Sequence, residues 1–210
     1  ITNDEIEDFK KKLEKAINNC SIVIFSGSVP NEECAEILTA GIELANKYDK
    51  ISILDTYGKH LNACIDKGPT VVHNNLSEIK NFFGNEREDI ETEYLKYLYS
   101  KNVKLAFLTN GSGQFYCSKY DFIYKVTPFN VTEKDATGSG DSFIAGVAHG
   151  LEIADIFEDI TKFATALGIK NAERWETSQV ELDDAQSIIP QIGFEAVGKK
   201  MKIIDDSPNY

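Results

Sequence analysis

The residues best suited to chemistry lie in one short stretch, Asp135–Phe143, which reads Asp-Ala-Thr-Gly-Ser-Gly-Asp-Ser-Phe. Gly138 and Gly140 flank a small residue at the start of a helical pattern. Successive backbone N–H groups of such a turn converge on one anion, with the helix dipole behind them. Asp141 falls within the first helical turn, where a carboxylate beside a bound phosphate can take the proton of an attacking hydroxyl. The stretch is therefore a candidate site for phosphoryl transfer.

The same stretch has a structural interpretation, a glycine turn followed by an aspartate that the helix dipole favours. Nine residues match by chance easily, so the stretch alone leaves both interpretations open. No G-x-x-x-x-G-K-S/T motif occurs in the sequence, which excludes a P-loop. The spacing Gly138-x-Gly140-x-x-Phe143 also lacks the third glycine of the dinucleotide fingerprint.

Composition narrows the classes of function. The chain has 210 residues, of which 42% are hydrophobic and 27% charged, as in an ordinary globular domain. Its 22 basic and 34 acidic residues give a net charge of −12. That charge disfavours a free-standing nucleic-acid binder and binding to an anionic membrane surface. No apolar run approaches the roughly 18 residues of a membrane span.

Four cysteines, Cys20, Cys34, Cys64 and Cys117, are far apart in the sequence and form no C-x-x-C pair. In a chain long enough for a full core, this usage is typical of reduced thiols in a cytoplasmic protein. Cys20 and Cys34 lie in or beside apolar patterns, which predicts that they pack in the interior.

The elements that must position the glycine turn alternate between strands and helices. Short apolar runs predict strands at 21–25, 51–55, 70–73 and 104–109. Helical patterns lie around them, at 2–17, 34–45, 61–65, 75–83 and 88–99. This alternation indicates βαβ units, and hence a parallel sheet with helices on both faces.

The pattern changes after Gly111. Short antiparallel or edge strands are predicted at 115–117, 122–126 and 131–132, followed by helices at 139–151 and 153–167. A helix near 182–188, a strand at 192–197 and a charged tail over about 198–210 complete one α/β domain.

Several further motifs, in order along the chain, resemble those of the ribokinase-like (PfkB) carbohydrate kinases. The run Gly138–Gly146 is similar to the C-terminal signature of that family, and Ser26–Pro30 is similar to the S-G-S-L-P turn of its phosphosugar-kinase branch. The other matching segments are Ile53–Thr56, a strand end; Asn75–Glu78, an N-x-x-E motif; Leu108–Gly111, a strand end; and Leu167–Ala172, the helix that closes the adenine site.

The resemblance implies a ribokinase-like three-layer α/β/α sandwich with a mostly parallel sheet. It also implies ATP-dependent phosphorylation of a sugar phosphate. Tagatose-6-phosphate kinases look most similar, and 1-phosphofructokinases or another sugar or nucleoside kinase of the family form the alternative. A nucleotide-binding or interaction module without catalysis is the alternative from another class.

The resemblance also implies roles for individual residues. Asp141 would be the catalytic base, beside the phosphoryl-binding turn of Gly138, Ser139 and Gly140. Asn75 and Glu78 would organise Mg²⁺, although the local sequence alone favours a plain helix cap. Ser26 and Ser28 would face the sugar, with an ordinary turn as the alternative. Residues expected along the ATP are Asn75, Thr109, Gly111, Gly113, Gly168 and Asn171.

Two departures from the family pattern matter. The family has K-P-N where this chain has His73-Asn74-Asn75, so the lysine that would meet the ATP phosphates is absent and His73 is a weak substitute. The loop Gly111-Ser112-Gly113-Gln114 has its second glycine one place early, which blurs its assignment to the adenine loop.

The resemblance covers nearly all of this chain but only the last two-thirds of a family member. We therefore expect the N-terminal part, with the sugar-binding lid, to be missing, and the chain alone to be inactive. Truncation would expose a strand edge on the side of residues 22–25 and 51–55. Covering that edge by self-association, as in a homodimer, or poor solubility is the expected consequence.

Overall fold

One mixed sheet forms the centre of the molecule. The structure, a computed structural model, describes residues 1–83 and 89–198. The strands lie in the sheet in chain order, with β1 to β4 parallel and β4 to β7 antiparallel. They are β1 (Ile22–Ser26), β2 (Ile51–Asp55), β3 (Val71–Asn75), β4 (Leu105–Thr109), β5 (Phe115–Lys119), β6 (Phe122–Thr127) and β7 (Gly193–Val197).

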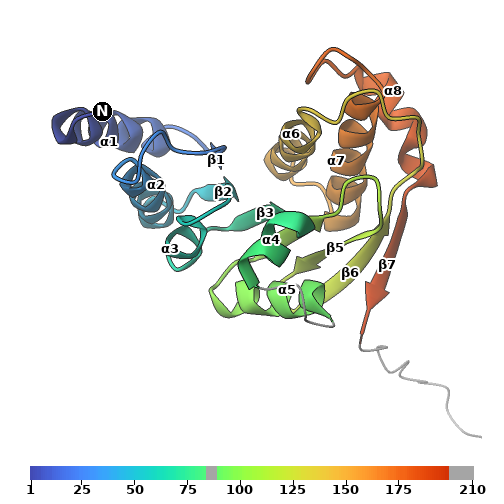
Figure 1. The fold of residues 1–210 in the computed structure, drawn as a ribbon, viewed down its shortest axis with the longest axis horizontal. Coiled ribbons are helices and arrows are strands. Elements are labelled where there is room, and N and C mark those ends of the chain that lie inside the picture. The colour runs from blue at the N-terminus through green and yellow to red at the C-terminus, as the bar shows by residue number, and fades with distance from the viewer. Residues whose placement is uncertain (84–88, 199–210) are drawn as a thin grey trace, which may run out of the picture.

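Helices cover both faces of this sheet (Figure 1). One face packs against α1 (Asn3–Asn18), α2 (Ala35–Lys47), α3 (Leu61–Ile65), α4 (Leu76–Phe83) and α5 (Ile90–Ser100). The other packs against α6 (Ser139–Glu152), α7 (Phe157–Ala172) and α8 (Leu182–Ile188), which a 3₁₀ turn, Ile189–Gln191, joins to β7. This arrangement confirms the three-layer α/β/α sandwich.

The alternation of side-chain direction along the strands explains why each face of the sheet has its own hydrophobic core. Ile53, Val71 and Phe107 pack with α6 to α8, whereas their neighbours Leu54, Val72 and Leu108 pack with the helices of the opposite face. Successive side chains of a strand point to opposite faces, so a strand covered on both sides is apolar throughout. The continuous apolar runs in the sequence have this cause.

The fold bears on two expectations from the sequence, that the cysteines are free thiols and that no segment spans a membrane. All four cysteines are free, and Cys34, Cys64 and Cys117 are buried, whereas Cys20 is half-buried. Within residues 1–83 and 89–198, no helix has both the length and the apolar character that crossing a membrane requires.

Two local predictions need correction, and others fall on residues or side chains that the structure does not describe. Val131-Thr132 forms no strand, because the chain there crosses towards the glycine turn without a neighbouring strand. The helix predicted from Ile153 begins at Phe157, and Ile153 and Ile156 are 58% and 63% exposed in the connection before it. The side chains of Phe82 and Phe83 and the tail from 199 to 210 lie outside the described residues.

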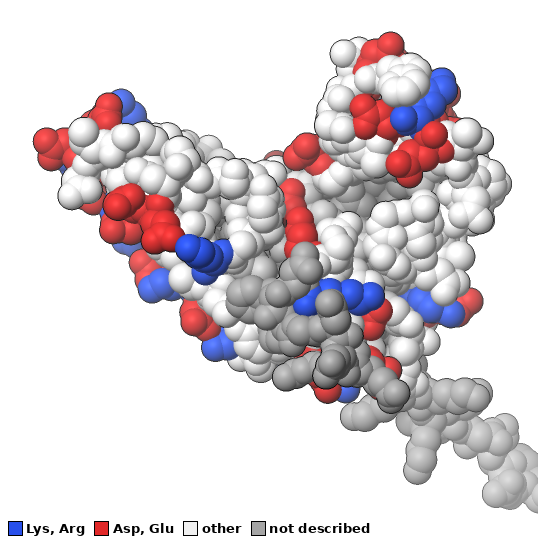
Figure 2. Space-filling view, in the orientation of Figure 1, with Lys and Arg blue, Asp and Glu red and all other residues white. Residues whose placement is uncertain are grey.

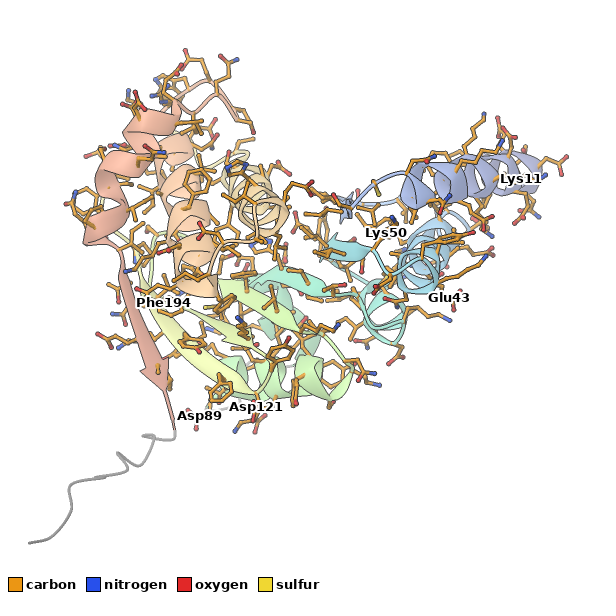
Figure 3. All side chains as sticks on the ribbon, turned by 180° about the vertical axis from the view of Figure 1, so that it is seen from behind. Lys11, Glu43, Lys50, Asp89, Asp121 and Phe194 are labelled. Carbon is orange, nitrogen blue, oxygen red and sulfur yellow. The ribbon has the colours of Figure 1, made fainter. Side chains whose placement is uncertain are left out.

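The two ends of the sheet differ in exposure. Among the described strands, β1 is at the end of the sheet and pairs only with β2, and Ile24 on it is 42% exposed. The expected edge is thus β1, whereas β2 lies inside the sheet. In the view from behind, Lys11 and Glu43 project from α1 and α2 near this end, and Phe194 marks β7 far away (Figure 3).

Candidate active site

A cavity of about 480 Å³ lies where the four parallel strands end. Ser26, Asp55, Asn75 and Thr109 are the last residues of β1, β2, β3 and β4, and all of them line it. Open parallel sheets bind ligands beyond the carboxyl ends of their strands, because the loops that follow the strands meet there. The strand register therefore brings together residues that are more than eighty positions apart in the sequence.

The glycine turn at the start of α6 forms another wall of this cavity, to which Ser139, Gly140 and Asp141 contribute. The amide of Ser139 donates to the carbonyl of Ala136 at 3.0 Å. In the part of the chain that the structure describes, the amides of Gly140 and Asp141 donate to no carbonyl. Free N–H groups in the first turn of a helix attract an anion, and the helix dipole adds to the attraction.

Asp141 stands beside these amides with an exposed carboxylate. No hydrogen bond or ion pair engages that carboxylate within the described residues. Both oxygens can therefore accept a proton from a ligand in the cavity, which a carboxylate already held by the protein would do less well.

Gly138 shapes the turn from behind. It caps α6 in the left-handed region, with φ 79°. A Cβ atom there would lie 2.3 Å from Cγ2 of Thr177 and 3.0 Å from Oγ of Ser178. Only glycine satisfies both the backbone conformation and this close approach.

We expect Gly138→Ala to lower the free energy of unfolding by about 1–3 kcal/mol, because it adds backbone strain and a steric clash. Urea unfolding measures this loss. Gly58→Ala is the matched control, since Gly58 has φ 84° and no atom within 4 Å of its added Cβ. Equal losses for the two variants would show that the contact with Thr177 is unimportant.

Asn75 and Glu78 form the helix cap that the sequence left as an alternative. The amide of Asn75 donates to Oε2 of Glu78 at 3.0 Å, and Oδ1 of Asn75 accepts from the amide and the hydroxyl of Ser77 at 2.9 and 2.8 Å. Both residues nevertheless line the cavity. Oε1 of Glu78 stays available to a metal or its waters within the described residues, whereas Oδ1 of Asn75 would have to release Ser77 to reach one.

The oxygen atoms of Asn75 and Glu78 suit a metal ion that is bound together with the phosphates of a ligand. Within the described residues, no cluster of three or more His, Cys, Asp or Glu side chains could hold a metal by itself. Mg²⁺ keeps several waters and takes one or two carboxylates together with substrate phosphates. Glu78 and Asn75 fit that role, whereas a protein cage for the ion does not exist in this part of the chain.

The side chain of His73 is buried, and both of its ring nitrogens have partners in the protein. Its Nδ1 lies 2.8 Å from Oδ1 of Asp55, its Nε2 lies 3.1 Å from Oγ1 of Thr109, and its ring stacks on Phe143 at 5.2 Å. With both ring nitrogens engaged and the residue 5% exposed, His73 offers no free N–H to a phosphate. This geometry argues against His73 as a substitute for the absent lysine at the ATP phosphates, which the sequence had left open.

Asp55 is the partner that fixes this histidine. Burial opposes its ionisation, but the hydrogen bond and charge of His73, aided by the Ser26 hydroxyl, hold the pKa of the Asp55 carboxyl below its ordinary value. Asp55 therefore remains a carboxylate at neutral pH and faces the cavity. The sequence marked Asp55 only as part of a strand end and gave no signal of the pairing.

One end of the cavity is apolar. A flat aromatic base fits such a surface, because its faces can pack against apolar side chains. Gly111 and Gly168, expected along the nucleotide, lie in this lining, and so do Ile169 and Ala172 of the matching segment Leu167–Ala172, whereas the other apolar positions carried no motif. The apolar positions at this end are Phe115, Pro128, Phe129, Val131, Ile169 and Ala172.

Besides Gly138, which lies behind the turn, three expected site residues do not line the cavity. Ser28 is exposed on the turn after β1, and the amide of Gly113 closes a tight turn by donating to the carbonyl of Asn110 at 2.9 Å. Asn171 is buried behind the glycine turn rather than beside the cavity. Local backbone geometry decides all three placements, and the motif pattern did not contain it.

The charged side chains in the described lining of the cavity are acidic apart from His73. The described lining carries four carboxylates and His73 but neither lysine nor arginine. In Figure 2, acidic atoms are visible in the hollow between the helices α1 and α2 and the helices α6 to α8. An anionic ligand therefore needs the free amides and an accompanying cation to offset the carboxylates Asp55, Glu78, Glu133 and Asp141.

Comparison with known proteins agrees with this fold. The family model of the pfkB family carbohydrate kinases matches residues 1–182. A tagatose-6-phosphate kinase of Staphylococcus epidermidis is 27% identical over 194 residues, which are 90% of this chain and 62% of that protein. The same-named protein of a second strain is 26% identical over the same length.

The solved structure of phosphofructokinase-2 from Escherichia coli superposes with a TM-score of 0.81 at 22% identity, covering 91% of this chain and 63% of that one. At this identity the likeness shows a ribokinase-like fold. The chain spans less than two thirds of the length of the relatives it matches.

Proposed function

The chain belongs to the pfkB family of carbohydrate kinases, and on that premise we propose that its cavity serves the transfer of a phosphoryl group from ATP to a hydroxyl of a sugar phosphate. The chain would be the C-terminal, nucleotide-binding part of such a kinase. ATP would lie with its base against the apolar end of the cavity and its phosphates at the glycine turn.

One observation carries this proposal. An unengaged carboxylate, Asp141, and two unengaged amides, those of Gly140 and Asp141, occupy the same wall of one cavity. Phosphoryl transfer needs little more than an aligned acceptor, a place for the proton and donors for the charge of the transferring group. The wall supplies the last two of these.

The step follows from these groups. The carboxylate of Asp141 accepts the proton of the sugar hydroxyl while that oxygen forms a bond to the γ-phosphorus of ATP. The bond from this phosphorus to the bridging oxygen breaks, and ADP leaves with the electron pair. The amides of Gly140 and Asp141 donate to the oxygens of the transferring group. Mg²⁺ held with Asn75 and Glu78 would offset the charge of the phosphates.

The acceptor we propose is tagatose 6-phosphate, which would yield tagatose 1,6-bisphosphate. The support is that both curated relatives described above are named tagatose-6-phosphate kinase. Fructose 1-phosphate is the competing acceptor, because the described lining of the cavity gives no contact that separates the two sugars.

Phosphorylation of a panel of sugars by the complete gene product that contains this sequence tests the proposal. We expect kcat/KM for tagatose 6-phosphate to exceed that for fructose 1-phosphate, and both to exceed the value for unphosphorylated hexoses by about 100-fold or more, since losing a phosphate contact costs several kcal/mol. A preference for an unphosphorylated sugar or a nucleoside would overturn the proposed acceptor. Absence of ATP consumption with every sugar would overturn the kinase activity.

A further inference from the structure

Asn171 lies behind the glycine turn and is 1% exposed. Its Nδ2 donates to the carbonyl of Thr137 at 2.8 Å and to Oγ of Ser139 at 3.0 Å. Its Oδ1 accepts from the amide of Ser178 at 2.6 Å and from Oγ of Ser142 at 3.4 Å. An asparagine side chain has two donor hydrogens and an oxygen with two lone pairs, so every bonding position of Asn171 is used.

The partners of Asn171 come from separate segments of the chain. Thr137 precedes the turn, and Ser139 and Ser142 lie in the first turn of α6. Ser178 belongs to the connection between α7 and α8. One side chain thus forms hydrogen bonds with three segments of the chain.

The connection between α7 and α8 also packs directly on the turn. The methyl group of Thr177 and the hydroxyl of Ser178 leave no room for a Cβ on Gly138. The Asn171 bond to the Ser178 amide fixes this connection in place. The direction of the Gly140 and Asp141 amides therefore depends on contacts made on the side of the turn that faces away from the cavity.

We propose that Asn171 is a positioning residue for the anion site, holding the glycine turn so that its free amides meet the phosphates of the nucleotide. This inference deepens the proposed function and rests on it. Asn171 does not line the cavity, so it acts only through the turn. Its loss should weaken the binding of phosphates and leave the binding of the base unchanged.

Calorimetric titration of Asn171→Ala with Mg·ADP and with adenosine separates these effects. We expect the Kd for Mg·ADP to rise about tenfold, the equivalent of about 1.4 kcal/mol, whereas the Kd for adenosine stays within twofold. Thr161→Val is the matched control, because Thr161 is buried in the same helix, donates to the carbonyl of Phe157 and does not line the cavity. It should change neither Kd.

Amide spectra of the free protein provide the second measurement. In Asn171→Ala, the ¹H–¹⁵N signals of Gly140 and Asp141 should shift, whereas those of Gly111 and Phe129 at the base end should not. If the parent chain bound neither ADP nor adenosine, the proposed function would fail, and these spectra would still decide whether Asn171 sets the turn. Unshifted Gly140 and Asp141 signals, or equal losses of ADP and adenosine affinity, would overturn the inference.

Discussion

Asp141→Asn should lower kcat for sugar-phosphate phosphorylation by about 10³-fold, with about 10² to 10⁴ as the range for removal of a general base. The amide has nearly the same shape as the carboxylate but cannot take the proton of the hydroxyl. The Kd for Mg·ATP should change by less than about threefold, because Asp141 reaches the acceptor rather than the base of the nucleotide. Steady-state kinetics of the complete gene product and calorimetry measure the two quantities.

Asp159→Asn is the matched control for this prediction. Asp159 is the third residue of α7, as Asp141 is the third residue of α6, and it lies outside the cavity. Both changes remove one negative charge from the first turn of a helix, so dipole effects on stability are similar. If kcat of Asp141→Asn stayed within tenfold of the parent value, the proton would have to leave by another route.

The sequence predicted the layers of the fold well, because each depends on local pattern. Buried parallel strands are apolar on both faces, as in the alternating pairs Ile53-Leu54 and Val71-Val72, and they are easily recognised. The start of α7 was missed because Ile153 and Ile156 continue the helical spacing on an exposed connection. Periodicity cannot distinguish an apolar residue in solvent from one in a core.

The candidate site was foreseen only where a backbone motif marks it. Gly138, Gly140 and Asp141 carry a turn signal, and the ends of the strands brought Ser26, Asn75 and Thr109 beside them. The pairing of His73 with Asp55 depends on the sheet register, which the sequence does not display. Asn171 was expected beside the nucleotide. Its hydrogen bonds place it instead behind the glycine turn, and they depend on the packing of α7 against α6.

The 210-residue polypeptide itself should bind Mg·ATP with a millimolar Kd and phosphorylate no sugar at a measurable rate. The apolar end of the cavity and the free amides lie in this chain, so the nucleotide retains these contacts. Calorimetry with Mg·ATP and a coupled assay of ADP release in the presence of tagatose 6-phosphate measure the two properties. Gly138→Ala, which distorts the turn, should weaken this affinity further, because it misplaces the amides that meet the phosphates.

We expect no transfer because the described part of this polypeptide provides too few contacts to hold the acceptor, the sugar phosphate, in position. The described lining of the cavity has neither lysine nor arginine, so it provides no cationic side chain for the phosphate that the sugar already carries. An acceptor held in line with the γ-phosphate gains an effective molarity of roughly 10⁵–10⁸ M, and an acceptor that diffuses freely gains none of it. Transfer at a normal rate by a monomer of this polypeptide would mean that the carboxylates, the free amides and a cation suffice to hold a sugar phosphate.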